Sequence, residues 1–352
     1  MEYRPLKEYI ELRQGLAINR GTSHLVSDFK NDDFTLPLLR IADMMENSYT
    51  KYISKDVNTT VIAEEEDIIY TRTGQVGLVF RGFSGVVHNN SFIVNVINKD
   101  IDEDYLFVVL QSEFVRTQAL NLAKNSVQPD LTHDKFKSII IPVPDMSIQK
   151  QIASNILKIN SKIDNNNKIN KELESMAKTI YDYWFLQFEF PNEEGKPYKS
   201  SGGNMVWNEE LKREIPEGWR VNSIFDCMDI IYGIPLSTAL FTENDGIPVI
   251  RIRDILSNTI SARTTEKIDN KYLSKKKDLL IGMDGNFHMS FWSNDGDCIN
   301  QRIVRIREND NDKVSVLQIY FEIEPYIRAK EKNVAKSTVG HLSDKDLKQL
   351  RI

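Results

Sequence analysis

The apolar positions between residues 152 and 184 predict one long helix. They recur at alternating steps of three and four residues, which is the spacing of the a and d positions of a coiled coil. The residues of this seam are Ile152, Ile156, Ile159, Ile163, Asn166, Asn170, Leu173, Ala177, Ile180 and Trp184. Pro142 and Pro144 precede the helix and Pro191 follows it. These limits allow a rod of about 40 residues, or about 60 Å at 1.5 Å per residue.

A seam of this length favours a second helix as its partner. The alternative is a long surface helix whose apolar side packs on its own domain. The seam includes two asparagines, and a buried asparagine commonly fixes the register of a coiled coil at a cost in stability. We therefore expect the seam residues, Ala177 excepted, to contact a partner helix.

Short segments on either side of the helix recur at an offset of 211 residues. PLLRIAD at 37–43 corresponds to PVIRIRD at 248–254, and DIIYTRTG at 67–74 corresponds to DLLIGMDG at 278–285. In the same way VHNNSFIV at 87–94 corresponds to CINQRIVR at 298–305, and residues 123–141 correspond to residues 334–352. Because four blocks keep one order and one offset, we expect two copies of one domain.

Each copy has the pattern of a mixed domain. Apolar runs and period-two alternation, as at 91–96, indicate short strands. Asp104 and Ser315 are expected to cap a helix in each copy, and Thr132 and Ser343 a second, shorter helix. The predicted fold class is α+β, with two similar β-rich domains joined by a long coiled-coil helix.

These elements divide the chain into four segments. The expected order is a first domain at 1–141, a spacer helix at 142–190, a linker at 191–219 and a second domain at 220–352. The linker is polar and rich in Gly, Ser and Lys, as is typical of a connection between domains.

The composition is that of a globular protein without a membrane span. Of 352 residues, 41% are apolar and 27% are charged, and no apolar run approaches the length of a membrane helix. The N-terminus lacks a signal sequence, and two cysteines, Cys227 and Cys298, cannot form a disulfide framework. We therefore expect a reduced, cytoplasmic setting. With a net charge of −6, nucleic-acid binding would depend on local patches.

Four strings resemble the specificity subunit of type I restriction–modification systems. The most specific is FEFPNEEGKPYKSSGGNMVWNEELKREIPEGW at 188–219, which is similar to that family's linker before the second recognition domain. IPVPDMSIQKQIA at 141–153 is similar to the start of its central conserved region. EEDIIYTRTGQVG and KKDLLIGMDGN are similar to a strand and turn of its recognition domains. The resemblance covers essentially the whole chain.

The resemblance implies a DNA-recognition subunit without catalytic activity. Each recognition domain would read one half of a bipartite sequence in double-stranded DNA. The helix would dock methyltransferase (modification) subunits, and restriction and translocase subunits would join through them. The family normally has a second conserved helix after the second domain. Ile352 corresponds to Ile141, so we expect that helix to be absent and the seam to pair with a second copy or to be covered by modification subunits.

The sequence lacks the motifs of DNA-modifying and ATP-driven enzymes. It has neither the Gly-rich cofactor loop nor the Asn/Asp-Pro-Pro-aromatic turn of a DNA methyltransferase, and it has no GxxxxGK[ST] loop. Asp130 and Lys135 lack the further acidic partner of a nuclease site, and the histidines lack metal-ligand spacing. The acidic cluster at 64–67 is expected to be an exposed turn. We therefore expect no catalysis, cofactor or metal in this chain.

Polar side chains in turns are the candidates for DNA contact. Arg can bind guanine with two hydrogen bonds, Asn or Gln can bind adenine, and Lys can contact phosphates. The candidates are Arg72, Gln75, Arg81, Asn89, Asn90, Lys124 and Asn125 in the first copy, and Asn286, His288, Gln301, Arg302, Lys332, Lys336 and Ser337 in the second. At least half are expected to be solvated or turn-forming residues instead. Arg40 and Arg251 are expected to form structural ion pairs with Asp43 and Asp254.

Two other functions fit the sequence less well. One is an interaction protein that uses the helix to oligomerise and has no DNA specificity. The other is a fragment of a fused methyltransferase. Salt-dependent binding to duplex DNA would exclude the first, and methyl transfer from S-adenosylmethionine by the isolated chain would favour the second.

Overall fold

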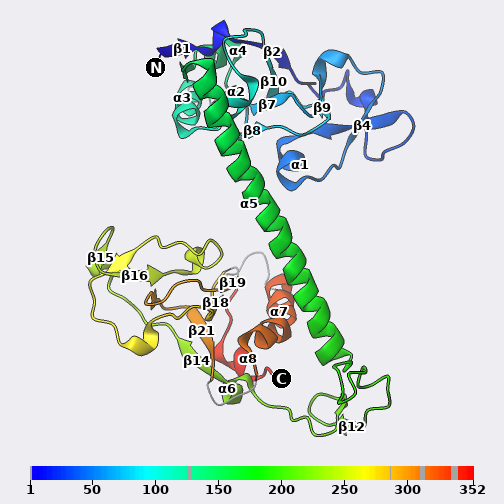
Figure 1. Ribbon diagram of the computed structural model, residues 1–352, viewed down its shortest axis with the longest axis vertical. Coiled ribbons are helices and arrows are strands. Elements are labelled where there is room, and N and C mark those ends of the chain that lie inside the picture. Colours follow the sequence, from blue (N-terminus) through cyan, green and yellow to red (C-terminus); the bar gives the residue numbers. More distant parts are fainter. Residues whose placement is uncertain (1, 125–128, 286, 310–313, 334–339) are drawn as a thin grey trace. The chain divides into compact units, whose positions relative to one another are not determined.

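The computed structural model describes residues 2–124, 129–285, 287–309, 314–333 and 340–352. Contacts divide the chain into two compact units, Met1–Ile169 and Asn170–Ile352. Each unit has its own sheets and helices (Figure 1). Both contain helix and sheet, which confirms the predicted fold class.

The first unit is built on a four-stranded antiparallel sheet in the order β2-β10-β7-β8. A five-stranded sheet in the order β3-β5-β4-β9-β6 has one parallel pair, β4 with β9, and β1 pairs with β11. The strands are β1 (Glu2–Pro5), β2 (Ile10–Gln14), β3 (Val26–Ser27), β4 (Phe34–Leu39), β5 (Tyr52–Ser54), β6 (Ile62–Ala63), β7 (Ile68–Thr71), β8 (Val79–Phe80), β9 (Gly85–Val87), β10 (Ser91–Val96) and β11 (Ile140–Val143). The helices are α1 (Ile41–Glu46), α2 (Glu103–Leu110), α3 (Glu113–Ala123) and α4 (His133–Lys137), with 3-10 turns η1 (Leu6–Glu8), η2 (Ser23–Leu25) and η3 (Thr59–Val61).

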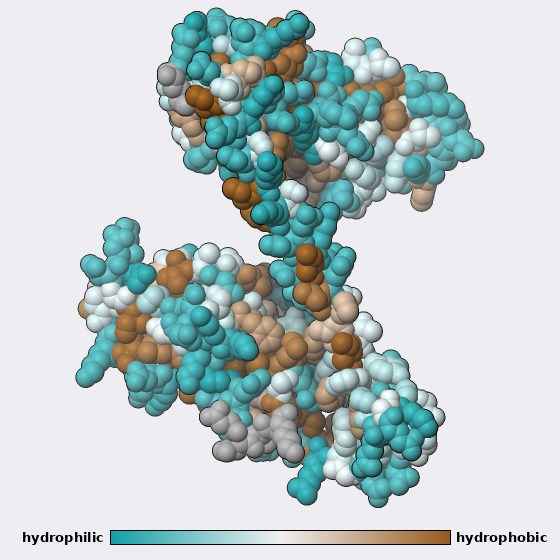
Figure 2. All heavy atoms as spheres, in the orientation of Figure 1, coloured by the Kyte–Doolittle hydropathy of each residue, from teal (hydrophilic) through white to brown (hydrophobic). Residues whose placement is uncertain are grey.

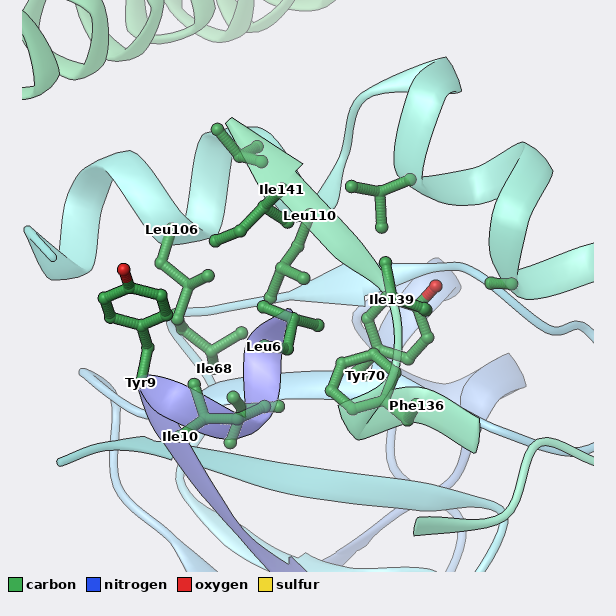
Figure 3. Close-up of a cluster of buried hydrophobic side chains, with 14 of the residues drawn as sticks. Leu6, Tyr9, Ile10, Ile68, Tyr70, Leu106, Leu110, Phe136, Ile139 and Ile141 are labelled. Atoms are coloured by element: carbon green, nitrogen blue, oxygen red, sulfur yellow. The ribbon is translucent and has the colours of Figure 1, made fainter. Parts of the chain in front are cut away.

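The four-stranded sheet of this unit is buried on both faces. Successive strand side chains point to opposite faces, so Ile68 and Tyr70 lie in one core and Ile69 in another. In the first core they pack with α2 and α4, and Figure 3 shows Leu106 and Phe136 from these helices directed into the same cluster. The opposite face packs against β4, β6 and β9 of the five-stranded sheet. Helices therefore cover one face of the central sheet and strands cover the other.

The second unit repeats this topology. Its antiparallel sheet has the order β14-β21-β18-β19, and β16 pairs in parallel with β20 as β4 does with β9. The strands are β12 (Met205–Asn208), β13 (Arg213–Pro216), β14 (Met228–Tyr232), β15 (Phe241–Thr242), β16 (Ile247–Ile250), β17 (Arg263–Thr264), β18 (Leu279–Gly282), β19 (Met289–Phe291), β20 (Cys298–Ile299) and β21 (Ile303–Glu308). The helical elements are α6 (Ile224–Cys227), α7 (Val316–Asn333) and α8 (Asp344–Lys348), with 3-10 turns η5 (Thr238–Leu240), η6 (Ile252–Asp254) and η7 (Asn270–Tyr272).

The strand register corrects one of the four repeat blocks. Leu38 pairs with Val86 in the first unit and Val249 with Cys298 in the second. The offset is therefore 211 on one strand but 212 on the other, because the second unit has one more residue before β20. Residues 87–94 consequently correspond to 299–306, so that Asn90 is the equivalent of Arg302.

Three of the four predicted helix caps are confirmed. The Oγ atoms of Thr132, Ser315 and Ser343 accept hydrogen bonds from the first turns of α4, α7 and α8. Asp104 was the wrong cap for α2, because the helix begins two residues earlier and Asp102 accepts from the backbone N–H of Tyr105 at 3.0 Å. Both aspartates fit an N-cap pattern, and the tertiary contact of the Asp102 backbone with Gln149 selects the earlier one.

The predicted long helix is α5 (Met146–Tyr181), which continues as a π-helical turn at Asp182–Leu186. Gln149, which is 1% exposed, fixes its start to the first unit. Its Nε2 donates to the carbonyls of Asp100 and Pro144 at 2.9 and 2.8 Å, and its Oε1 accepts from the N–H of Asp102 at 2.8 Å. In the second unit, the ring of Tyr181 lies 5.3 Å from that of Phe321.

The seam of α5 is largely uncovered. Ile152 is half-buried against the first core, but Ile159, Ile163 and Leu173 are 57%, 51% and 56% exposed. The seam asparagines are exposed as well. Figure 2 shows apolar side chains on the surface of this helix. The contact with a partner helix stays a prediction.

The segment between α5 and α6 contains an ordered hairpin. β12 pairs with β13, and the ring of Phe190 stacks on those of Tyr198 and Trp219, with centroids 4.7 and 5.2 Å apart. This aromatic cluster gives the segment expected to be a linker a packed structure of its own.

An ion pair with a buried carboxylate joins two adjacent strands, β18 and β21, of the second unit. The Asp278 carboxylate, which is 1% exposed, accepts from Nε and Nη2 of Arg307 at 2.6 and 2.7 Å. This hydrogen bond with Asp278 raises the pKa of Arg307. The first unit has the equivalent carboxylate, Asp67, but its partner is Arg13 on β2, which β10 separates from β7, with Nη2 2.9 Å from Oδ2 of Asp67.

We expect Asp278→Asn to lower the free energy of unfolding of the second unit by about 1–3 kcal/mol, because the half-buried guanidinium of Arg307 would lose its charged partner. Urea unfolding followed by tryptophan fluorescence measures this unit, since all four tryptophans lie beyond residue 170. Asp245→Asn, at an exposed aspartate of the same unit, should stay within about 0.5 kcal/mol. Equal losses for the two variants would contradict a stabilising role of the ion pair.

Candidate nucleic-acid interface

Arg72 directly follows β7, and Asp130 and Phe92 fix the position of its side chain. Its Nη2 donates to both carboxylate oxygens of Asp130 at 2.6 and 2.8 Å, and its Cζ lies 5.4 Å from the ring centre of Phe92. Burial raises the pKa of Asp130, but hydrogen bonds from Thr73 and Arg72 outweigh burial and lower it. Asp130 therefore stays ionised and fixes the guanidinium.

Gln14, at the end of β2, joins this pair to a neighbouring turn. Its Oε1 accepts from Nη1 of Arg72 at 3.2 Å and lies 3.0 Å from Nε2 of His133. Its Nε2 donates to the carbonyl of Asn89 at 2.8 Å. Burial, and then Arg72, lower the pKa of His133, so the imidazole is neutral at pH 7. The sequence did not predict Gln14 or His133, because these contacts join residues 58 and 119 positions apart.

The other candidates of the first unit are spread over several turns. Asn89 and Asn90 are half-exposed before β10, and the Asn90 carbonyl accepts from the N–H of Arg72 at 2.7 Å. Arg81 pairs with Asp104 at 2.5 Å, and its Cζ lies 5.4 Å from the ring centre of Phe107. Gln75 and Lys124 are exposed, and Lys124 donates to Oδ1 of Asn121 at 2.8 Å. The structure thus brings Arg72, Asn89 and Asn90 together and places the others elsewhere.

The second unit presents a more open arginine at the equivalent turn. Arg302 has a left-handed backbone (φ 66°), is 57% exposed, and its Nε lies 3.4 Å from Asp284. The same carboxylate lies 2.6 Å from Nδ1 of His341. The backbone bridge between Asp284 and His341 is the equivalent of the bridge between Thr73 and Asp130. Each copy therefore has one aspartate at this bridge. In the first unit it is the later residue of the pair, Asp130, and in the second unit it is the earlier residue, Asp284.

The remaining candidates of the second unit lie around this turn and on α7. Gln301 is exposed and directly precedes Arg302, His288 is half-buried before β19, and Lys332 is exposed at the end of α7. Four candidates lie outside the described residues: Asn125, Asn286, Lys336 and Ser337.

The predicted structural ion pairs are confirmed. Nε of Arg40 lies 2.6 Å from Asp43, and Nε of Arg251 lies 3.5 Å from Asp254. Each arginine also donates to a hydroxyl ten residues later, Thr50 in the first unit and Ser261 in the second. Both aspartates are buried, so each ion pair holds the start of a helical turn, α1 after β4 and η6 after β16.

The described part of the chain contains no group of three or more His, Cys, Asp or Glu side chains placed to hold a metal ion. Within the same residues, no helix is long and apolar enough to span a membrane.

Comparison with known families decides the identity of the two repeated units. The model of the type I restriction modification DNA specificity domain matches residues 1–175 and 216–352. The chain belongs to this family. The match includes both copies of the repeat, and it confirms the resemblance found in the sequence.

Curated relatives are specificity subunits of type I restriction enzymes. The MjaIX subunit of Methanocaldococcus jannaschii is 28% identical over 192 residues, which are 54% of this chain and 42% of the relative. The EcoBI subunit of Escherichia coli is 32% identical over 134 residues, 38% of this chain and 28% of the relative. The chain thus spans less than half the length of these two relatives. The putative MjaX subunit is 26% identical, with 100% of this chain and 82% of the relative covered.

A solved structure has the same fold. The crystal structure of a type I restriction–modification system S subunit from M. genitalium has a TM-score of 0.57 with this chain at 12% identity, covering 99% of this chain and 83% of the other.

Proposed function

We propose that this chain is the DNA sequence-specificity subunit of a type I restriction–modification complex, in which each repeated unit binds one half of a bipartite target in double-stranded DNA. One observation carries the proposal: two copies of one α+β domain, both matched by a DNA specificity domain family, are present in one chain. The names of the curated relatives support it.

The proposed division of labour follows the segments expected from the sequence. Recognition domains at 1–141 and 220–352 bind DNA, the helix within 142–190 docks modification subunits, and the segment at 191–219 connects the helix to the second domain. Restriction and translocase subunits join through the modification subunits. The chain itself carries out no reaction, needs no cofactor, and works in the cytoplasm.

The exposed seam of α5 supports the docking step. Large apolar side chains that stay half-exposed along several turns are typical of a surface that another protein covers. The same observation favours the alternative function, an oligomerisation protein without DNA specificity, so DNA binding distinguishes the two. A mobility-shift assay with the purified chain and modification subunits should give salt-dependent, duplex-specific binding. Association without any binding to duplex DNA would favour the alternative.

Arg302 is the candidate whose guanidinium is most available to a base. We expect Arg302→Ala to weaken binding to the specific duplex by about 1–3 kcal/mol and to change preference in one half-site only. Arg328→Ala is the matched control, because Arg328 is 55% exposed and pairs with acidic side chains of its own helix. Equal losses on specific and random duplex would make Arg302 a phosphate contact, and no loss would exclude it from the interface.

A further inference from the structure

Two equivalent turns of the repeated units have opposite charge. Glu64–Glu66 precede β7 in the first unit, and Lys275–Lys277 precede β18 in the second, at the offset of 211. All six side chains are exposed. The contrast extends beyond the turns: residues 263–277 contain six Lys or Arg and two acids, whereas the equivalent residues 52–66 contain one Lys and four acids.

The two turns have the same backbone structure. In the first, the N–H of Glu64 donates to Oδ2 of Asp67 at 3.0 Å, and the N–H of Asp67 donates to the Glu64 carbonyl at 3.0 Å. In the second, the N–H of Lys275 donates to Oδ2 of Asp278 at 2.7 Å, and the N–H of Asp278 donates to the Lys275 carbonyl at 3.1 Å. The fold therefore conserves the turn between the copies and reverses the sign of its side chains.

The lysine turn is fixed at every residue. The N–H of Lys276 donates to Oδ1 of Asp295 at 2.8 Å, and the N–H of Lys277 donates to the carbonyl of Trp292 at 2.9 Å. The turn ends at Asp278, which Arg307 holds in the interior. An anchored backbone fixes where the three lysine side chains start, so binding a ligand costs side-chain entropy but little backbone entropy.

The ammonium groups of this turn are available to a ligand. Among the described residues, no carboxylate oxygen lies within 4.0 Å of Nζ of Lys275, Lys276 or Lys277, whereas several other lysines of the unit, such as Lys212 and Lys348, have such a partner. Three neighbouring ammonium groups that form no ion pair repel one another. A polyanion is the class of ligand that removes this repulsion.

Resting on the proposed function, we propose that Lys275–Lys277 contact phosphates of the DNA bound by the second unit, while the equivalent turn of the first unit makes no such contact. Lysine is suited to this task, because its ammonium group contacts phosphate as a point charge. A phosphate contact does not depend on the base sequence. The glutamates at the same place would repel the DNA backbone. The electrostatic contribution to DNA binding therefore differs between the two half-sites. Binding by the second unit depends more strongly on salt.

The salt dependence of DNA binding tests this assignment. Each phosphate contact contributes about −0.9 to the slope of log K against log salt, so Lys275→Gln/Lys276→Gln/Lys277→Gln should make the slope less steep by up to about 2.7. Between 50 and 200 mM salt the unmodified chain should then lose about 40-fold more affinity than the variant. The assay uses the full chain with its modification subunits, bound to a duplex that contains the target.

Two matched variants control the experiment. Glu64→Gln/Glu65→Gln/Glu66→Gln neutralises the equivalent turn and should leave the slope unchanged. Lys196→Gln/Lys199→Gln/Lys212→Gln removes the same charge from exposed positions in the segment between α5 and α6, and should also leave it unchanged. Tryptophan fluorescence checks that the second unit of the two lysine variants is folded, and circular dichroism checks the fold of the glutamate variant, whose changes lie in a unit without tryptophan.

The outcomes separate this inference from the proposed function. If the unmodified chain does not bind duplex DNA, the proposed function is wrong. If it binds and the lysine variant keeps the slope, or the lysine control lowers the slope equally, only the phosphate contact is wrong. If the lysine variant keeps the slope but weakens association with a second copy or with modification subunits, the lysine turn binds an acidic protein surface instead.

Discussion

Replacing residues 220–352 with the second recognition domain of another family member is expected to change one half of the methylated DNA sequence and to leave the other half intact. Each unit has its own central sheet and its own buried core, so the new domain can fold without altering the first. Sequence is read by the side chains that contact base edges in the DNA grooves, and these side chains belong to one unit for each half-site. The specificity of one half-site should therefore be transferred with one domain.

The reciprocal exchange of residues 1–141 is the control for this prediction. It should alter the half of the target that the first exchange preserves. Methylome sequencing of cells that express each chimaera with modification subunits gives both results. If either exchange changes both halves, the two units do not bind DNA independently and the proposed architecture is wrong.

Changing two seam residues, Ile159→Asp and Ile163→Asp, is expected to abolish association through α5. A buried large aliphatic side chain contributes about 1.5–3 kcal/mol, so two of them in one interface correspond to at least about a 100-fold loss of affinity. The expected partner is a second α5 in antiparallel orientation with Asn166 and Asn170 near the crossing, or a modification subunit. Light scattering at micromolar concentration, with and without modification subunits, measures the association.

Ile169→Asp is the matched control, since Ile169 is 52% exposed on the same helix but lies off the seam. It should leave association nearly unchanged, whereas Ile163→Asp alone should weaken it. A chain that is monomeric without partners, binds modification subunits as well after the double change, and is equally soluble and stable would show that the seam is not an interface.

The sequence predicted the features that depend on local pattern. The seam predicted α5, because a period of three and four residues follows from helix geometry. The ion pairs of Arg40 and Arg251 were predictable, since the partner aspartate lies only three residues later in each case. The repeat was found because strand patterns survive in both copies even where few residues are identical.

The features that depend on distant residues were not predictable. The sequence does not indicate that Arg72 is held by Asp130 and Gln14, because strand pairing creates those contacts. The shift of the offset to 212 was hidden for the same reason, since only the pairing of β16 with β20 fixes the register. Glu64–Glu66 and Lys275–Lys277 lie directly before the aligned blocks at 67–74 and 278–285, so their opposite charge can be read from the sequence. The identical geometry of the two turns cannot, because it depends on the hydrogen bonds of the folded chain.

The DNA sequence that the native chain specifies tests the central claim most directly. Cells that express the chain with modification subunits should contain one new methylated motif, with two short defined halves separated by a spacer of fixed length, and this motif should be absent when the chain is omitted. A contiguous motif, the same motif without the chain, or no motif from an assembled complex would contradict the account.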